Sequence, residues 1–446
     1  MKTSVAKNIL RAISYVRREN IWQSLEFLEN SQWWTYERIQ EYQQKKLVKL
    51  ITHCSEKVPF YMRWFEDNSC TPLDIKLHNI DLLPVIDKSF LRDNIGQFIA
   101  LDCEGPIEWA KTSGSTGIPL HFPKSLKSSA FQRAAMYRGH RWHGVEVGAK
   151  EARLWGIPVS KISRYKVVLI DYLLNRFRQR EPHNSSAVFD DFCTRLKKRG
   201  AVYLAGYTSL VRQFAEYLKD TGRRGLEYGF KMVKCTSETI FDSDREIIEA
   251  VFGCPLVSEY GAAETGVIAF QCEAGSQHLM SDCCIVEFLD PKDKIGDPDL
   301  KEVVVTNLNN FTLPFLRYRI GDLAIPSLEN CSCGRELPLV RKIVGRVDDV
   351  IKASDGCHWL SSFLEDLLKE LAIKHRSIAQ FKVLQSEMGK LEFLLVPKEN
   401  FTPEFKAYLR KKCMEYFDGK MEIDIRLVDN IPREASGKLR YFVSTI

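Results

Sequence analysis

A loop near residue 115 combines glycines with hydroxyl-bearing residues, a composition typical of a site that holds phosphate. Its members are Thr112, Ser113, Gly114, Ser115, Thr116 and Gly117. Glycine lets the backbone approach an anion closely, and the N–H groups and hydroxyls then donate hydrogen bonds to it. The order differs from that of the common P-loop, which places Lys-Ser/Thr after its last glycine, because Ile118 and Pro119 follow here. Since an ordinary surface turn has the same composition, the loop alone indicates an anion site without identifying the ligand.

Four further stretches carry charged residues beside glycine and follow the loop in order along the chain. They are SEYGAAETG at 258–266, YRIGDL at 318–323, GRVDDVI at 345–351 and PREASGKLR at 432–440. Together with the loop, this series resembles the adenylate-forming superfamily of acyl-CoA synthetases, peptide-synthetase adenylation domains and luciferases. Three more segments look similar to the phenylacetate-CoA ligase branch, and in particular to relatives found with capsular polysaccharide biosynthesis. These are PFY at 59–61, DLLPVIDKSFLRD at 81–93 and CSCGR at 331–335.

The resemblance implies an ATP-dependent ligase that activates a small carboxylic acid. In the first half-reaction the carboxylate attacks the α-phosphorus of ATP, giving an acyl-adenylate and pyrophosphate. In the second, a nucleophile takes the acyl group and AMP is released. The expected acceptor is CoA, or alternatively an amine or sugar in surface polysaccharide assembly, and the fold does not choose between them. A nucleotide-binding module without turnover is less favoured because the charged motif residues are intact. A phosphotransferase is less favoured because its usual lysine after the glycine loop is missing.

The catalytic roles that the resemblance implies fall on Lys438, Glu264 and Thr116. Lys438 is expected to reach between the carboxylate and the α-phosphate, where charge develops on the phosphoryl oxygens and a cation stabilises it. Glu264 is expected to bind Mg²⁺, a hard cation that prefers oxygen ligands, with Thr116 beside it. The alternative for Lys438 is a solvated lysine in a polar tail.

The remaining positions implied by the resemblance bind the nucleotide or move the domains. The loop closes over the β- and γ-phosphates of ATP, the ring of Tyr260 stacks on adenine, and Asp322 grips both ribose hydroxyls. The other members are Ser237 and Glu238 lining the adenine pocket, Gly261 as a further nucleotide contact, Arg346 near the ribose or phosphates, and Asp348 at a hinge. Without the motifs, a tyrosine at a strand end is more often a core residue, and an aspartate after glycine is often a turn residue.

The thirteen cysteines indicate a reducing cytoplasm, because no export signal accompanies them. A Cys₃His set suited to a structural zinc ion is formed by Cys272, His278, Cys331 and Cys333. Three points stand against zinc binding by this set. Its spacing is not that of a zinc finger, and free thiols are commonly buried without binding a metal. In addition, Cys283 and Cys284 are alternative ligands. We expect such a zinc ion to tie two loops together near the adenine pocket, with no open coordination position.

Length and composition predict an α/β protein, α+β overall, with two domains. The 446 residues are 45% hydrophobic and 27% charged. The net charge of +6 is too small for a chain of this length to indicate a nucleic-acid partner. We expect residues 1–345 to form an N-terminal ATP- and acid-binding domain with sheets flanked by helices, and residues 346–446 a small mobile α+β domain. No apolar run reaches the length of a transmembrane helix. The sequence leaves the oligomeric state open.

Periodicity predicts the elements that position these residues. Residues 1–100 are expected to be mostly helical with a break at 59–61, and short apolar runs predict buried strands at 255–260 and 302–308. A helix at 243–252 is predicted to begin with Ser243 and Glu246 in capping-box spacing and to end at Gly253. Residues 378–427 are predicted to form a ββαβ unit, its helix starting after Thr402.

Two stretches, residues 9–19 and 165–180, combine basic residues with an apolar face. Either face suits an anionic membrane surface. Burial against the protein's own core explains such faces more often, so a weak membrane contact is the less expected alternative, especially for the first stretch.

Overall fold

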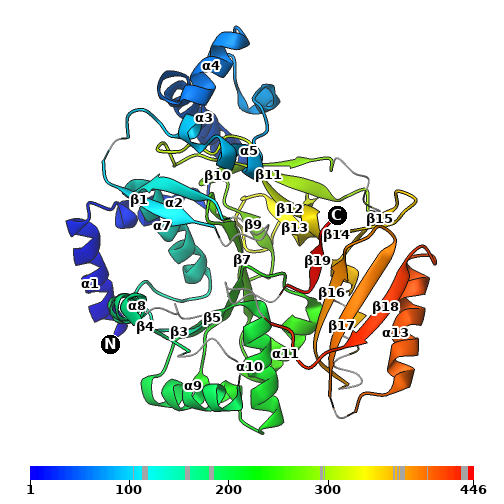
Figure 1. The fold of residues 1–446 in the computed structure, drawn as a ribbon. Coiled ribbons are helices and arrows are strands. Elements are labelled where there is room, and N and C mark those ends of the chain that lie inside the picture. The colour runs from blue at the N-terminus through cyan, green and yellow to red at the C-terminus, as the bar shows by residue number, and fades with distance from the viewer. Residues whose placement is uncertain are drawn as a thin grey trace.

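The chain folds into a large N-terminal lobe, built on one extended sheet, and a small C-terminal lobe (Figure 1). The computed structural model describes residues 1–103, 105–112, 119–155, 161–179, 185–291, 295, 297–364, 367–368, 371, 377–398, 400–432 and 440–446. Helices and strands of both lobes give the mixed α/β and α+β architecture that the sequence predicts. The predicted fold class is therefore confirmed.

The first hundred residues are mostly helical, as expected. Their helices are α1 (Thr3–Val16), α2 (Ile21–Ser31), α3 (Tyr36–Lys57), α4 (Pro59–Asp67), η1 (Leu77–Leu82), α5 (Lys88–Asp93) and α6 (Ile95–Phe98). Helix α3 begins after Thr35, whose hydroxyl accepts a hydrogen bond from the N–H of Arg38. It ends just before Pro59, which occupies the first turn of α4, so the predicted break is confirmed.

One mixed sheet of the N-terminal lobe contains eleven strands in the described part of the chain. Their order is β10 (Cys284–Leu289), β11 (Lys301–Asn307), β12 (Tyr318–Ser327), β13 (Leu339–Arg346), β9 (Gln277–Leu279), β8 (Gly266–Gln271), β7 (Leu256–Ala262), β6 (Val233–Thr236), β5 (Tyr203–Gly206), β3 (Glu151–Leu154) and β4 (Arg176–Arg178). From β4 to β7 neighbouring strands are parallel, whereas β8 pairs antiparallel with β7. Strands β7 and β11 confirm the strands predicted at 255–260 and 302–308.

Helices join the strands of the parallel half (Figure 1). They are α7 (Leu126–Trp142), α8 (Lys161–Leu173), α9 (Ser186–Arg199), α10 (Thr208–Asp220), η2 (Gly225–Tyr228) and α11 (Asp242–Phe252). Helix α11 confirms the predicted helix and ends at Gly253 in the left-handed conformation, with φ 63°. The predicted capping box of Ser243 and Glu246 is wrong. The helix begins one residue earlier, so the Asp244 side chain instead accepts a hydrogen bond, at 3.1 Å, from the N–H that precedes the helix.

The C-terminal lobe contains its own small sheets and its own hydrophobic core. Its elements are β14 (Val350–Lys352), β15 (His358–Leu360), β16 (Ile378–Gln385), β17 (Lys390–Pro397), α13 (Pro403–Tyr416), β18 (Glu422–Leu427) and β19 (Phe442–Ser444). The four-stranded sheet has the order β18-β17-β16-β19, and Figure 1 shows α13 beside β18. The predicted ββαβ unit is confirmed. The short helix η3 (Val347–Asp349) joins the lobes and includes Asp348, but the boundary at 345/346 and the hinge stay predictions.

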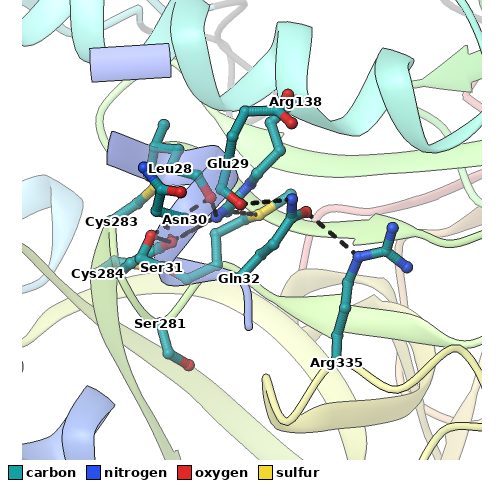
Figure 2. Close-up of polar contacts among 12 residues, drawn as sticks. Leu28, Glu29, Asn30, Ser31, Gln32, Arg138, Ser281, Cys283, Cys284 and Arg335 are labelled. Carbon is teal, nitrogen blue, oxygen red and sulfur yellow. Dashed lines mark hydrogen bonds and ion pairs between the residues drawn. The ribbon is translucent and has the colours of Figure 1, made fainter. Parts of the chain in front are cut away.

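A buried ion pair ties three parts of the N-terminal lobe together. Arg138 on α7 contacts both carboxylate oxygens of Asp282, with an Nη2–Oδ1 distance of 2.9 Å, and both side chains are fully buried. Ser31, at the end of α2, donates to the same carboxylate at 2.5 Å. Figure 2 shows the contacts around this arginine. Because buried charges are costly unless paired, the network favours one packing of α2 and α7 against the segment before β10.

Within the described residues, no helix has both the length and the apolar composition that crossing a bilayer requires.

Candidate active site

A cleft of ≈ 780 Å³ lies at the carboxyl ends of the parallel strands, and residues of both lobes line it. From the N-terminal lobe, Trp155 follows β3, Tyr207 follows β5 and Ser237 follows β6. From the C-terminal lobe come Ser361, Ser362 and the segment 440–442. Carboxyl ends of parallel strands meet at one edge of a sheet, which is where open α/β folds bind their ligands. The cleft is therefore the candidate active site.

The described residues to which the sequence assigns nucleotide contacts all line this cleft. They are Thr112, Ser237, Glu238, Tyr260, Gly261, Glu264, Asp322 and Arg346. Ser113, Gly114, Ser115, Thr116, Gly117 and Lys438 lie outside the described residues. The fold thus brings segments from distant parts of the chain to one place, while the role of each residue stays a prediction.

Asp322, Tyr260 and Arg346 form a contiguous polar group contributed by three strands. The Tyr260 hydroxyl, on β7, donates to Asp322 Oδ2 at 2.9 Å, and Arg346 on β13 places its Nε 3.7 Å from Asp322 Oδ1. Asp322 and Arg346 are paired residues in the β12–β13 ladder, so the sheet register sets their approach. Burial raises the pKa of Asp322, while the Arg346 guanidinium and the Tyr260 hydroxyl act in the opposite direction. Burial and the Asp322 carboxyl raise the pKa of Tyr260, which keeps the phenol protonated as a donor.

Glu264 offers a second, separate carboxylate to the cleft. It follows β7, is only 6% exposed, and its Oε1 accepts a hydrogen bond of 3.0 Å from the hydroxyl of Tyr318. One bond from a neutral donor leaves the carboxylate with acceptor capacity for a hard cation. Lys124 is buried nearby. Its pKa is lowered by burial, and the charges of Glu264 and Glu108 act against that shift. The sequence did not point to Lys124, because a lysine in a short strand is usually exposed.

Ser237 and Glu238 form the turn that leaves β6. Ser237 has a φ of 70°, in the left-handed region that a residue with a side chain rarely adopts. The carboxylate of Glu238 accepts hydrogen bonds from the N–H and hydroxyl of Ser209, at 2.8 and 3.1 Å, at the N-terminus of α10. A carboxylate is stabilised at this end of a helix. These bonds hold Glu238 in place beside Ser237, and both residues line the cleft. Strained backbone is common at functional sites.

The base of the glycine loop is closed by two hydrogen bonds. The loop joins β1 (Ile107–Lys111) to β2 (His121–Ser125), which pair antiparallel. The N–H of Thr112 donates to the Leu120 carbonyl at 3.0 Å, and the N–H of Leu120 donates to the Thr112 hydroxyl oxygen at 2.9 Å. Thr112 is buried and lines the cleft. Thr112 therefore fixes the position at which the loop begins. Its hydroxyl proton can also be donated to a ligand in the cleft.

Several cleft residues were missed from the sequence. The guanidinium of Arg440 forms an ion pair with Asp349, with an Nη2–Oδ1 distance of 3.1 Å, and both residues line the cleft. Trp155 and Tyr207 place their ring centroids 4.4 Å apart on the β3–β5 side, and burial together with Glu238 raises the pKa of Tyr207 to about 12. Neither pair has a local signal, because its members lie far apart in the chain.

The predicted Cys₃His set comes together as one cluster. Its four ligand atoms, from Cys272, His278, Cys331 and Cys333, all lie within 4.8 Å of one another. Cys272 follows β8, His278 lies in β9, and the two remaining cysteines lie between β12 and β13. The Cys272 and Cys331 sulfurs are 3.6 Å apart, and the Cys333 sulfur is 3.2 Å from His278 Nε2. The cluster could hold a metal ion.

The surroundings of the cluster fit a zinc ion. His278 Nδ1–H donates to the Leu337 carbonyl at 2.9 Å, which fixes the tautomer that leaves Nε2 free as a ligand. Three sulfurs and one imidazole are a common tetrahedral zinc shell. The competing ligands Cys283 and Cys284 lie elsewhere, with their thiols donating to Asp282 and to the Met280 carbonyl.

The chain is similar in sequence to several known proteins. A family model described as the CapK C-terminal domain matches residues 353–445. Protein CapK of Staphylococcus aureus is 23% identical over 425 residues, covering 91% of this chain and 89% of that protein. Phenylacetate-coenzyme A ligase of Thermus thermophilus is 24% identical over 346 residues, covering 71% of this chain and 72% of that enzyme.

Among solved structures, 2-hydroxyisobutyryl-CoA ligase in the postadenylation state with 2-HIB-AMP has the same fold. Its TM-score is 0.72 at 18% identity, covering 92% of this chain and 90% of that one. The same enzyme with 2-HIB-AMP and CoA in the thioesterification state gives a TM-score of 0.60, also at 18% identity, covering 93% of both chains.

Proposed function

We propose that the chain is an adenylate-forming ligase, which uses ATP to activate a carboxylic acid and then transfers the acyl group to CoA. The observation that carries this proposal is the cleft in which the Asp322, Tyr260 and Arg346 group lies in the same site as the separate carboxylate of Glu264. A carboxylate beside a cation suits the ribose and phosphates of a nucleotide. A second carboxylate suits the metal ion that accompanies those phosphates.

The proposed roles follow from what each group can donate or accept. Asp322 accepts hydrogen bonds from the ribose hydroxyls, and its bond to Tyr260 holds the tyrosine ring for stacking on adenine. Arg346 adds positive charge beside the ribose and phosphates. Glu264, with Thr116, holds Mg²⁺, which neutralises charge on the phosphoryl oxygens when bound. Ser237 and Glu238 shape the adenine pocket through their strained turn.

We assign the transition-state cation to Lys438 and the domain division to residues 1–345 and 346–446, with the hinge at Asp348. Lys438 lies two positions before Arg440, which forms the ion pair with Asp349 next to the hinge. A swing about Asp348 would change this ion pair, which makes it a contact specific to one pose. The better match to the postadenylation state of 2-hydroxyisobutyryl-CoA ligase supports the adenylation pose for this conformation.

Two kinds of acceptor for the acyl group are proposed, CoA and an amine or sugar. Phenylacetate-coenzyme A ligase and 2-hydroxyisobutyryl-CoA ligase support CoA. The alternative is an amine or sugar acceptor in capsular polysaccharide biosynthesis. The specific observation that favours it is the match to CapK over nearly the whole length of both chains. The aromatic pair Trp155 and Tyr207, which lines the cleft after β3 and β5, is proposed to contact the acid.

We also propose that the Cys₃His cluster binds one structural zinc ion. All four ligand atoms are protein atoms, so a filled tetrahedral shell leaves no position for substrate. The metal would tie the β8–β9 hairpin to the loop between β12 and β13. It would thereby support the strands that carry Tyr260 and Arg346.

Pyrophosphate exchange into ATP across a panel of carboxylic acids tests the proposal, followed by screening of CoA, amines and sugars as acceptors. The right acid is expected to give AMP and pyrophosphate, because the attack is at the α-phosphorus. Lys411→Ala, at an exposed lysine of α13, is the matched control for Lys438→Ala and should exchange like the wild type. Dominant ADP formation would contradict the mechanism. ATP binding without exchange for any acid would favour a non-catalytic nucleotide-binding module.

A further inference from the structure

Helix α8 turns its apolar stripe toward solvent. Tyr165, Val168, Leu169 and Tyr172 are 80%, 62%, 59% and 66% exposed, and Ile170 beside them is 47% exposed. The first four follow the spacing i, i+3, i+4, i+7, which places them on one face of a helix. In a globular protein such a stripe normally packs on the core. The expectation that core burial explains this stretch is therefore wrong for α8.

Helix α1 lies beside α8 at the same edge of the molecule, away from the C-terminal lobe (Figure 1). Just after α8, the Asn175 side chain donates to the Gly148 carbonyl at 2.9 Å and to the Met1 carbonyl at 3.3 Å, which links the end of α8 to the residues just before α1. On α1, Tyr15 and Val16 are exposed, whereas Leu10 and Ile13 are half-buried. We call the exposed residues Tyr15, Val16, Tyr165, Val168, Leu169, Ile170 and Tyr172 the α1–α8 surface.

The two segments that carry this surface are strongly basic in sequence, while Lys7 pairs with Glu146 and Arg17 pairs with Glu19 and Glu108. Residues 1–18 and 161–178 together contain ten basic residues and one acidic residue. The rest of the chain contains 54 basic and 57 acidic residues, so the net positive charge of the protein comes from these two segments. The single acid, Asp171, is buried and bonded to Arg176 and Arg178. The described solvent-facing side of α8 thus carries apolar side chains and the cation of Lys166, with no exposed carboxylate.

We propose that the α1–α8 surface docks on an anionic lipid bilayer, with α8 lying in the plane of the headgroups. Tyrosines suit the interface because the ring is apolar and the hydroxyl is polar, and the aliphatic side chains between them enter the acyl boundary. Lysines and arginines around the stripe meet the lipid phosphates. A second copy of the chain is a poorer occupant, because two such positively charged faces repel each other.

Docking in this manner sets the orientation of the enzyme. The surface lies on the β3–β4 side of the sheet, whereas the C-terminal lobe lies at the other side (Figure 1). A lobe that moves during the reaction would therefore stay free of the bilayer. The inference does not depend on the proposed ligase activity, because it uses no residue of the cleft.

Flotation of the full-length protein with lipid vesicles tests the proposal. We expect binding to vesicles of phosphatidylcholine mixed with phosphatidylglycerol, little binding to pure phosphatidylcholine, and weaker binding at high salt. V168E/L169E should lower the partition coefficient by roughly tenfold or more, because it replaces apolar side chains in the stripe by charges that anionic lipid repels.

The matched control is L73E/M388E, which makes the same chemical change at two exposed apolar residues elsewhere. It should bind vesicles like the wild type. Circular dichroism and the melting temperature of V168E/L169E should match those of the wild type, so that lost binding is not lost folding. Equal binding to neutral and anionic vesicles, or wild-type binding by V168E/L169E, would overturn the proposal. So would a change in sedimentation velocity showing that the substitution breaks a dimer while lipid binding is unchanged.

Discussion

Replacing Cys331 by serine is predicted to release a structural zinc ion and to destabilise the N-terminal lobe. Cys331 is half-buried in the loop between β12 and β13, and its sulfur lies 3.6 Å from that of Cys272 at the end of β8. Serine keeps the size of the side chain but is a poor zinc ligand. Without metal, the sulfur atoms make only weak contacts with one another and with His278, so the two loops lose part of their connection and keep the ion pair between Arg335 and Glu273.

The size of the effect follows from the loop that the metal closes. Cys272 and Cys331 lie 59 positions apart. A cross-link closing a loop of this length removes about 4 kcal/mol of unfolded-chain entropy in the polymer model. For a large domain, 1 kcal/mol shifts the Tm by ~2 °C. Complete loss of zinc is therefore expected to lower the Tm by about 8 °C, and Cys331→Ser, which keeps three ligands, by part of that.

Metal analysis and thermal melting are the assays. Protein purified without chelator should contain about one zinc ion per chain, and chelation should lower the Tm of the wild type more than that of Cys331→Ser. Cys103→Ser and Cys254→Ser are matched controls at half-buried thiols outside the cluster. Both should keep zinc and chelator sensitivity. Well-folded, active wild type without metal, or the same loss of Tm in all three variants, would refute the zinc site.

Four further predictions test the cleft and the core. Lys438→Ala should slow acyl-adenylate formation by about two orders of magnitude or more, while sparing transfer from a supplied acyl-adenylate. Asp348→Pro should hold the C-terminal lobe in one pose and slow the half-reaction that needs the second pose. Equal loss of both half-reactions in Lys438→Ala and in Asp348→Pro would contradict a hinge at Asp348. Tyr260→Phe removes a hydrogen-bond donor to Asp322 and should raise the KM for ATP roughly tenfold, since hydrogen bonds to charged groups contribute ~1.5–3 kcal/mol. An unchanged KM for ATP would show that Tyr260 and Asp322 do not bind the nucleotide. Asp282→Ala leaves a buried guanidinium unpaired and should lower the free energy of unfolding in urea by about 3–5 kcal/mol, and a loss below ~1 kcal/mol would refute that estimate.

Elements set by local patterns could be predicted from the sequence. The break before Pro59, the strand at 256–262 and the ββαβ unit each follow from residues close together in the chain. The start of α11 was mispredicted because acidic residues at 244 and 246 both suit a capping box. Tertiary packing favours Asp244 over Glu246 as the capping residue, because the guanidinium of Arg212 on α10 binds the buried Asp244 at 2.8 Å.

The candidate site divides in the same way. Motif residues such as Asp322 and the four members of the Cys₃His cluster could be identified because their types and order carry information. The ion pair of Arg440 with Asp349 joins positions 91 apart, so no local pattern predicts it. The apolar stripe of α8 shows a further limit. Its spacing is the same whether the stripe faces a core or a membrane, and only the tertiary structure shows that the core does not cover it.

For the proposed ligase, the sheet explains why the acid is harder to predict than the nucleotide. The parallel strands β3, β5, β6 and β7 each contribute a residue at their carboxyl end to the lining of the cleft, whereas the edge strand β4 does not. The ends of β6 and β7 supply Ser237 and Glu264, to which the sequence resemblance assigns contacts with the nucleotide and its metal ion. The ends of β3 and β5 supply Trp155 and Tyr207, which fall in no motif. A pocket that differs with each acid cannot share a sequence pattern, so the topology gives the location that we propose for the acid, and its proposed specificity depends on these side chains.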